Sequence, residues 1–321
     1  MIIDFHTHLG DVLQQDGGSI IRHGRVRKPI IFDPLLLFES RQWRATRGAR
    51  LLAQQCIKAG MARSATATLA NIQQAMQQCA VDFCVTLPVF PNVTFNDLKS
   101  AARQDPRMLP FTSVDFSSID TVEQKLSADV SEGAHGLKLH PILQKVPLNH
   151  PDTYAAVEAF AVHNRPILFH SGVSEYYTEQ TDKHRAAPEY GNIEGAVELV
   201  TNFPGVNFVV GHAGMDSVDQ TMQQMGHLHN VWVEISFQSP ERVRELVSVF
   251  GPERVLYGSD WPWGNMWATM NVVSTVTRHD PALAYRILYA NAQDLLDVSL
   301  LPKANKQAQL STLAASENVV M

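Results

Sequence analysis

The sequence predicts an α/β fold, a (β/α)8 TIM barrel of parallel strands. Short apolar runs alternate with stretches of helical spacing along most of the 321 residues, and this is the pattern of parallel strands joined by crossover helices. Five of these runs end in residues that can bind a metal ion, namely IIDFHTH, GLKLHP, PILFH, NFVVGH and RVLYGSD. Because the carboxyl ends of barrel strands converge at one face, we expect these residues to share one site.

Eight strands are expected, each with boundaries uncertain by about 2–4 residues. They are Ile2–His6, Asp82–Leu87, Leu109–Val114, Gly136–His140, Pro166–His170, Val206–Gly211, Val231–Ile235 and Arg254–Gly258. Helical spacing lies between them, as in Ile119–Val130, Thr153–His163, Ile193–Asn202, Met215–Met225 and Glu241–Val249. The first-turn N–H of a helix has no intrahelical partner, so proline is tolerated there and helices are expected to begin at Pro151, Pro240 and Pro281.

We expect one domain over residues 1–300, followed by a peripheral polar tail over residues 301–321. A hydrophobic content of 45% is enough for a large core. Residues 11–66 interrupt the alternation after the first strand and carry a net charge of +6, against −12 for the remainder. This insertion is interpreted either as a lid that recognises an anionic substrate or as a solvated or subunit-packing helix.

Composition and charge exclude several classes of protein. The net charge of −6 gives no electrostatic footprint for nucleic acid, and no stretch approaches 18 uninterrupted apolar residues, so no membrane span is expected. Strand-like residues begin at Ile2 and leave no room for a secretion signal, which favours the cytoplasm. Cys56, Cys79 and Cys84 are odd in number and lack CxxC spacing, so we expect free thiols. The chain is compatible with a homodimer.

The histidines and one aspartate at the strand ends suit a metal centre. His6 and His8 are two apart on a strand, so both imidazoles point to the same face. His170 ends a proline-led strand before a sharp SerGly exit and is the expected third ligand. Asp260 ends the eighth strand, where a carboxylate can bind the ion and also act as a base. A divalent ion, zinc or alternatively manganese, is the expected cofactor.

The chain resembles the amidohydrolase superfamily, in the branch of aminocarboxymuconate-semialdehyde decarboxylase-like metal-dependent hydrolases. The resemblance is carried by DFHTH at 4–8, GLKLHP at 136–141, PILFHSG at 166–172, VVGHAG at 209–214, ERVLYGSDWP at 253–262 and ILYANAQDLL at 287–296. It implies His6, His8 and His170 as ligands, Asp260 as ligand or general base, and His212 as the catalytic histidine. The alternative for His212 is a structural histidine at a strand end.

Other residues near the strand ends have open roles. Lys138 and His140 share a strand face, and we expect Lys138 to bind a substrate carboxylate and His140 to line the site. In dinuclear relatives a carboxylated lysine at this position bridges two ions and the sixth-strand histidine binds the second; one ion per chain is favoured here. Trp261, like Trp263, either forms an apolar wall of the substrate pocket or packs in the core. Glu234 either lines the barrel or pairs with an arginine.

The sequence thus predicts a hydrolase that cleaves an ester, lactone or amide bond of a small anionic molecule through a metal-activated water. The alternative is non-oxidative decarboxylation of an aromatic or unsaturated carboxylic acid at the same site. A third hypothesis is a binding protein that keeps the barrel without the chemistry. His150, His163, His184 and His279 lie in turn or helix contexts and are interpreted as surface residues.

Overall fold

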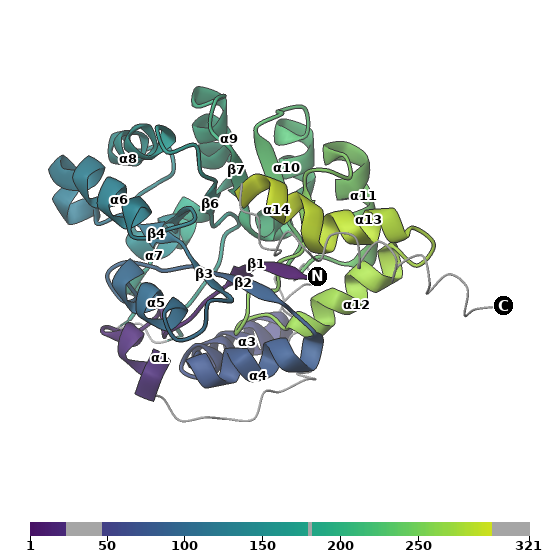
Figure 1. The fold of residues 1–321 in the computed structure, drawn as a ribbon, viewed down its shortest axis with the longest axis horizontal. Helices are drawn as coiled ribbons and strands as arrows, with labels where there is room; N and C mark the ends of the chain where they lie inside the picture. The colour runs from purple at the N-terminus through teal and green to yellow at the C-terminus, as the bar shows by residue number, and fades with distance from the viewer. Residues whose placement is uncertain (24–46, 179–181, 297–321) are drawn as a thin grey trace.

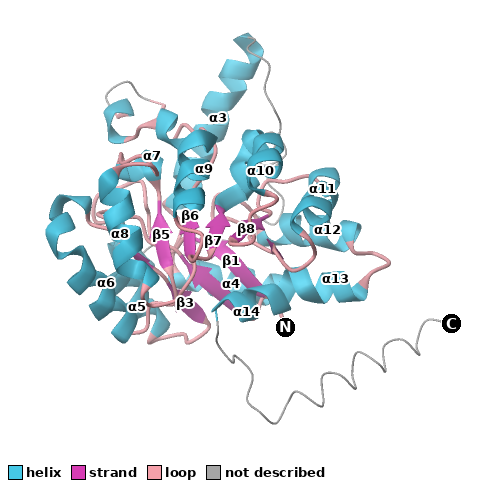
Figure 2. Ribbon diagram, turned by 90° about the horizontal axis from the view of Figure 1, so that it is seen from above, coloured by secondary structure: helices cyan, strands magenta, loops and turns pink. Residues whose placement is uncertain are grey.

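Parallel strands lie at the centre of the molecule and helices surround them (Figures 1 and 2). The structure, a computed structural model, describes residues 1–23, 47–178 and 182–296. Its strands are β1 Ile3–Thr7, β2 Phe83–Thr86, β3 Met108–Pro110, β4 Thr112–Ser113, β5 Leu137–Leu139, β6 Ile167–Phe169, β7 Phe208–Val210, β8 Val231–Glu234 and β9 Val255–Leu256. Every strand pair is parallel and joins neighbours in chain order, so the predicted (β/α)8 fold is confirmed.

The third predicted strand is divided into β3 and β4 at Phe111. The order is β1-β2-β3 in one sheet and β4-β5-β6-β7-β8-β9 in the other. The Phe111 N–H still donates to Thr86 of β2 at 3.0 Å, while the next N–H, of Thr112, donates to Gly136 beside β5 at 2.8 Å. This one segment therefore connects the two sheets. Backbone bonds also link β1 to the segment after β9, among them Asp260 N–H to the His6 carbonyl at 2.8 Å.

Helices alternate with the strands, as the sequence indicates. They are α1 Ile20–His23, α3 Arg47–Ser64, α4 Leu69–Cys79, α5 Phe95–Ala102, α6 Val122–Ser131, α7 Pro141–Gln144, α8 Pro151–Ala161, α9 Ile193–Asn202, α10 Val218–Met225, α11 Pro240–Phe250, α12 Met266–Val276, α13 Pro281–Tyr285 and α14 Asn291–Leu296. The three expected prolines occupy first turns, behind the capping side chains of His150, Ser239 and Asp280. These helix starts are confirmed.

Two predicted helices begin three residues later than expected: α6 begins at Val122 instead of Ile119, and the second is α10. The spacing over Met215–Met225 predicts a helix from Met215, but α10 begins at Val218. The segment before it, from His212 to Met215, has backbone φ angles between 47° and 84°. Positive φ is incompatible with a right-handed helix. The apolar spacing reflects burial of this turn as well as of the helix, and the turn is where His212 lies.

The core is divided between the outside and the inside of the ring of strands. The larger cluster lies between strands and helices and includes Phe160, Phe169, Phe208 and Leu246. A smaller cluster, called here the inner apolar layer, gathers buried side chains from β1, β2, β3, β6, β7 and β9. Its members include Ile3, Phe5, Val85, Phe111, Leu168, Val209 and Leu256. Side chains from so many strands meet only inside the ring, and α14 packs against β1 and β9.

Several sequence-based predictions concern the surface and the termini. His150, His184 and His279 are exposed and His163 is half-buried. All three cysteines are free. None of the described helices combines the length and the apolar character needed to cross a membrane. Residues 24–46, which hold several arginines of the insertion, and the predicted tail lie outside the described residues. The homodimer and the cytoplasmic location stay predictions.

Candidate active site

An irregularity in β1 brings both of its histidines into one cluster. The pairing of β1 with β2 changes register between Asp4 and Thr7. In a regular strand, neighbouring side chains point to opposite faces. Here Phe5 lies in the inner apolar layer, and the next residue, His6, nevertheless lies in the histidine cluster, where it faces His8. A bulge of this kind re-aims side chains. His6 and His8 point to the same side, as their spacing of two predicts. The irregularity in β1 that orients them has no signal in the sequence.

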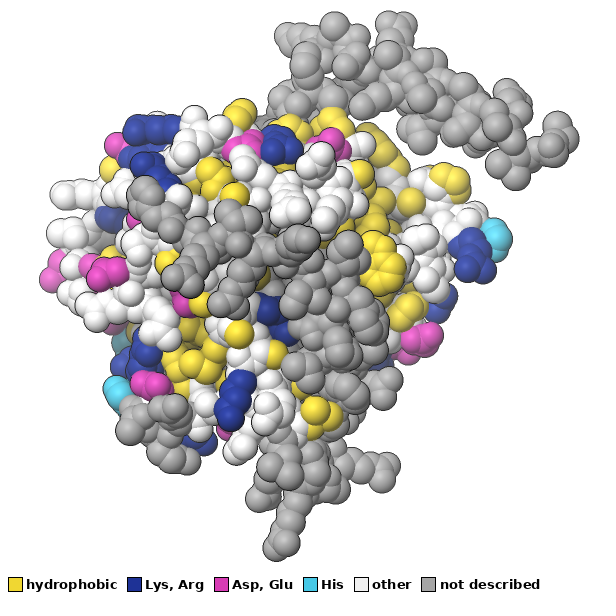
Figure 3. Space-filling model, turned by 90° about the horizontal axis from the view of Figure 1, so that it is seen from below, with side chains coloured by type: hydrophobic (Ala, Val, Ile, Leu, Met, Phe, Trp, Pro, Cys, Tyr) yellow, Lys and Arg dark blue, Asp and Glu magenta, His cyan; other side chains and the backbone are white. Residues whose placement is uncertain are grey.

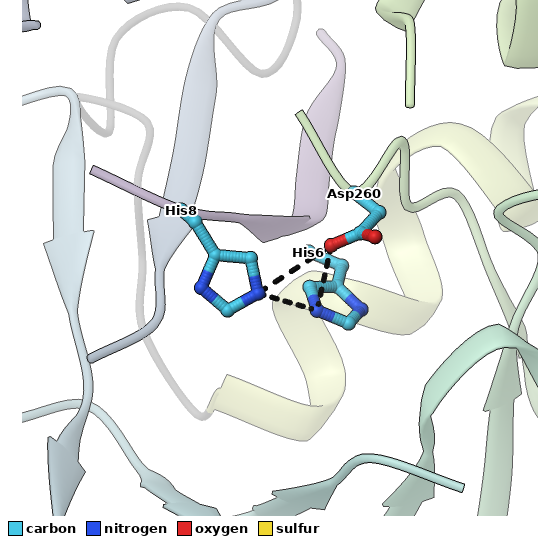
Figure 4. Close-up of side chains that lie close together, drawn as sticks. All are labelled: His6, His8 and Asp260. Carbon is cyan, nitrogen blue, oxygen red and sulfur yellow. Dashed lines mark hydrogen bonds and ion pairs between the residues drawn. The ribbon is translucent and has the colours of Figure 1, made fainter. Parts of the chain in front are cut away.

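His6, His8 and Asp260 meet at one point (Figure 4). The two Nε2 atoms lie 3.2 Å apart, and Asp260 Oδ1 lies 3.3 Å from the first and 3.4 Å from the second. All three side chains are buried. Asp260 Oδ1 has no hydrogen-bond partner among the described residues, although a buried carboxylate oxygen is costly to leave unpaired.

The outer nitrogens of the two imidazoles fix where their protons are. His8 Nδ1 lies 2.9 Å from the Leu87 carbonyl, which can only accept, so His8 donates from Nδ1. His6 Nδ1 lies 2.8 Å from the Glu234 carboxylate and donates to it. Both Nε2 atoms then carry lone pairs toward the Asp260 oxygen. Two imidazole lone pairs and a carboxylate oxygen that face one another suit a cation, and two imidazoles with one carboxylate fit a divalent metal ion.

His170 and His212 lie beside this group. His170 Nε2 donates to the Gly172 carbonyl at 2.9 Å, which leaves the Nδ1 lone pair directed at His212 Nε2, 3.1 Å away. His212 stacks on His6 with ring centroids 4.8 Å apart. A second group of possible donors, His6, His212 and Glu234, is also close together. The structure therefore brings three of the predicted ligands, His6, His8 and Asp260, into one possible metal site, and it places His170 next to His212 beside that site, while their roles stay predictions.

Lys138 and His140 enter the same region from β5. The Lys138 amine is buried, has no hydrogen-bond partner within the described residues, and burial lowers the pKa of Lys138 to about 7. His140 stacks almost parallel on His170, with centroids 4.4 Å apart. Its Nε2 lies 3.2 Å from the hydroxyl of Tyr176. Both predicted residues thus lie in the cluster, and Tyr176 joins them there.

Burial sets the protonation of the histidines. Desolvation is the largest cause that lowers the pKa of His8 and of His170, each to about 3. The pKa values of His6, His140 and His212 are also well below the usual range, again mainly because of burial. The imidazoles are consequently neutral at pH 7, and a neutral imidazole is the form that binds a metal ion.

A cavity of about 300 Å³ opens onto the cluster. His170, His212 and Asp260 line it on one side, and residues of α3 line it on another: Ala53, Cys56, Ile57, Gly60, Met61 and Arg63. Trp263 lines the cavity, whereas Trp261, the tryptophan predicted for substrate binding, is not among the lining residues described and packs in the outer core. Trp263 therefore forms the expected apolar wall, whereas Trp261 takes the packing alternative.

Tyr176 was not predicted as a site residue, and the sequence left two alternative roles open for Glu234. Tyr176 lies in the loop after β6, contacts Trp263 with ring centroids 5.4 Å apart and lines the cavity. The available signal was its place after a barrel strand, where active-site residues concentrate. Glu234 is fully buried and bonds His6, so it lines the barrel rather than pairing with an arginine.

The surface near α3 shows no single basic patch in the described residues that are visible. α3 and α4 lie at the lower side of Figure 1, and Figure 3 views the molecule from below. Lys and Arg side chains are scattered there among hydrophobic ones. Among the described residues that line the cavity, Arg63 carries the positive charge. Burial raises the pKa of Asp260, and Arg63 lowers it by less.

The fold and the site together define a barrel with a histidine-rich, carboxylate-containing centre at the carboxyl ends of its strands. A family model described as Amidohydrolase matches residues 3–298, and the chain belongs to this family. The suspected resemblance is thus confirmed. No relative was found among the curated proteins.

Solved structures support the fold. A 5-carboxyvanillate decarboxylase from Novosphingobium aromaticivorans with bound manganese has 13% identity and a TM-score of 0.64, covering 93% of this chain and 97% of that one. A 2,6-dihydroxybenzoate decarboxylase from Rhizobium has 12% identity and a TM-score of 0.64, covering 92% and 98%. A probable 2-pyrone-4,6-dicarboxylic acid hydrolase from Acinetobacter baumannii with bound citric acid has 14% identity and a TM-score of 0.57, covering 92% and 99%.

Proposed function

We propose that the protein is a metal-dependent hydrolase that cleaves an ester, lactone or amide bond in a small anionic molecule. The observation that carries the proposal is the group of three acceptor atoms on His6, His8 and Asp260, within 3.4 Å of one another at the wall of a cavity. His170 would complete the ligand set through Nδ1, which its own hydrogen bond leaves with a lone pair.

The chain's own groups would hold and move protons around the reacting bond. A divalent ion, when bound, would polarise the substrate carbonyl and lower the pKa of water. Asp260 faces both the ligand set and the cavity, so it would accept a proton from the attacking water. His212 also lines the cavity, and its Nε2 lone pair would accept this proton in the alternative in which His212, rather than Asp260, relays it to the leaving group.

The cavity favours a small substrate with a negative charge. Its volume of about 300 Å³ lies at the lower end of ligand sites. Arg63 supplies a guanidinium at one wall, and Tyr176, Phe237 and Trp263 supply aromatic surface. An arginine recognises a carboxylate with two parallel hydrogen bonds, and aromatic rings would hold a planar carbon skeleton.

Turnover of anionic lactones, esters and amides by protein reloaded with metal tests the proposal. We expect hydrolysis that is abolished by a chelator and restored by zinc or manganese. Asp260→Asn and His212→Asn are each expected to reduce kcat by about 10²–10⁴-fold. The matched control is His279→Gln, an exposed histidine, which should leave kcat unchanged. An absence of metal-dependent hydrolysis across all three bond classes would count against the proposal.

Non-oxidative decarboxylation is the second candidate, because two of the similar structures above are decarboxylases of aromatic acids. The same cluster would bind the substrate carboxylate, and Asp260 would protonate the ring carbon as carbon dioxide leaves. Carbon dioxide release from hydroxylated benzoates, measured beside the hydrolysis assay, separates the two reactions.

The metal is proposed to be zinc or manganese, one ion per chain. Elemental analysis of protein purified without chelator tests both statements. About one ion per chain, lost in His170→Ala, is the expected result. Two ions per chain would move Lys138 and His212 into the ligand set.

A further inference from the structure

Three alternating residues at the end of β8 hold the three polar groups of His212. Glu234 accepts the backbone N–H of His212 in a short hydrogen bond. Ser236 Oγ lies 2.6 Å from His212 Nδ1. Gln238 Nε2 donates to the His212 carbonyl at 2.7 Å. All three residues are buried; Glu234 ends β8, and Ser236 and Gln238 lie in the segment that turns after it.

His212 needs this support because of its backbone. Its φ of 57° lies in the left-handed region, which a residue with a Cβ occupies only at an energetic cost. The residues that follow His212, from Ala213 to Met215, also have positive φ angles and do not form a regular helix. Hydrogen bonds to the N–H, the carbonyl and the ring together leave His212 with one orientation.

The same contacts determine which ring nitrogen of His212 carries the proton. Ser236 Oγ donates its hydrogen to Glu234 Oε1 at 3.1 Å, so it has only lone pairs to offer the imidazole. In this arrangement His212 donates from Nδ1, and its Nε2 lone pair faces the His170 Nδ1 lone pair 3.1 Å away, as two donors to a cation would. The Nε2 lone pair is consequently directed toward His170 and the cavity, which is the form required for proton transfer there.

Glu234 extends this arrangement to the predicted metal ligands. Its Oε1 atom also accepts the Nδ1–H of His6 at 2.8 Å, while Oε2 accepts the Ser236 N–H at 2.8 Å. One carboxylate therefore orients a histidine that faces the cation site and a histidine that faces the substrate. Such partners of ligating histidines fix their tautomer and raise their basicity.

Gly258 provides the space for this carboxylate. A Cβ built on Gly258 would lie 2.6 Å from Glu234 Oε2 and 3.1 Å from Glu234 Cβ. Gly258 precedes Asp260 by two residues, on the segment that follows β9. A methyl group at this position would displace Glu234 without changing any of its polar atoms.

We propose that Glu234, Ser236 and Gln238 are positioning residues that fix the orientation and the tautomer of His212 and, through Glu234, those of His6. The predicted effects on turnover rest on the proposed function, whereas the predicted orientations and tautomers of His212 and His6 do not. Glu234 couples ion binding to proton transfer, whereas the Ser236 hydroxyl contacts the ring of His212 and not that of His6.

Nitrogen-15 spectra of histidine rings in the full chain, recorded without metal, test the geometry. We expect the Nδ1–H tautomer for both His6 and His212 in the wild type. In Ser236→Ala the His212 ring should lose this preference while His6 keeps it, and Ser236→Thr, which restores a hydroxyl, should recover it. Both rings should change in Glu234→Gln. An Nε2–H tautomer at His212 in the wild type would overturn the inference, whatever reaction the protein performs.

Ion affinity and turnover test the coupling. Zinc dissociation constants, measured by chelator competition, should rise about 10–100-fold in Glu234→Gln and in Gly258→Ala, and should stay unchanged in Ser236→Ala and in the exposed control Glu241→Gln. Ser236→Ala should instead lower kcat about 10–100-fold with KM within about twofold. Unchanged zinc affinity in both Glu234→Gln and Gly258→Ala would overturn the coupling. Failure of the wild type to bind zinc would instead refute the proposed function.

Discussion

The inner apolar layer and the polar cluster differ completely in composition, although the same strands build both. Leu168 belongs to the apolar layer and His170, two residues later, to the cluster. Likewise, Leu256 belongs to the apolar layer and Asp260 to the cluster. The apolar layer needs only close contact, whereas the cluster leaves the Lys138 amine and one Asp260 oxygen unpaired among the described residues. Stability and chemistry are thus separated along the strands, as barrel enzymes require.

The largest expected effect tests the stabilising layer. Phe111 is fully buried, packs edge-on against Phe5 with centroids 6.0 Å apart, and occupies space that a Cβ on Gly136 would invade at 2.4 Å. Phe111→Ala should therefore lower the free energy of unfolding by about 3–5 kcal/mol. Urea unfolding measures the change. Native zinc affinity in the folded variant is the control, and a loss of affinity as large as that of His8→Ala would break the separation of the layers.

The next effect comes from filling the polar cluster. If the proposed ion binds the folded chain alone, a concentration of roughly 1,000 times its dissociation constant should raise the free energy of unfolding by about 4.1 kcal/mol. Thermal unfolding with and without chelator measures this difference. His8→Ala should abolish the response to the ion because it removes a predicted ligand. A response of equal size in His8→Ala would show that the ion binds elsewhere.

Replacing the buried lysine should stabilise the metal-free protein. Burial lowers the pKa of Lys138 from 10.5 to about 7, so the unfolded chain binds more protons than the folded chain between these values. Lys138→Met should thus be more stable by about 1–4 kcal/mol at pH 6. The advantage should shrink as pH rises from 7 to 10.5, because the wild type gains stability over that interval. A difference independent of pH would contradict the low pKa.

The smallest effect is expected outside the barrel. Arg242 bonds Asp219 at 2.6 and 3.0 Å and Glu245 at 2.7 Å, with side chains that are partly or largely exposed. Exposed ion pairs contribute little, so Arg242→Gln should change the free energy of unfolding by less than about 1 kcal/mol. The same urea assay measures it. A change above about 2 kcal/mol would show that charged groups matter as much at the surface as within the cluster.

Much of the fold and of the candidate site could be predicted because periodicity and strand ends are local features. The eight strands, the proline-started helices and the gathering of His6, His170 and Asp260 all followed from short segments. The bulge in β1 and the left-handed turn at His212 could not be predicted, since both depend on contacts with distant strands. Which of Trp261 and Trp263 lines the cavity could not be predicted for the same reason.

Helix α3 has a further consequence for how this protein acquires new substrates. The candidate ligands all lie at strand ends, whereas one wall of the cavity belongs to a single helix of the insertion. This part of the cavity wall is therefore encoded apart from the candidate ligands. Mutations in residues 53–63 can change the shape of the cavity wall without replacing any candidate ligand. This short segment is therefore a suitable target for laboratory evolution.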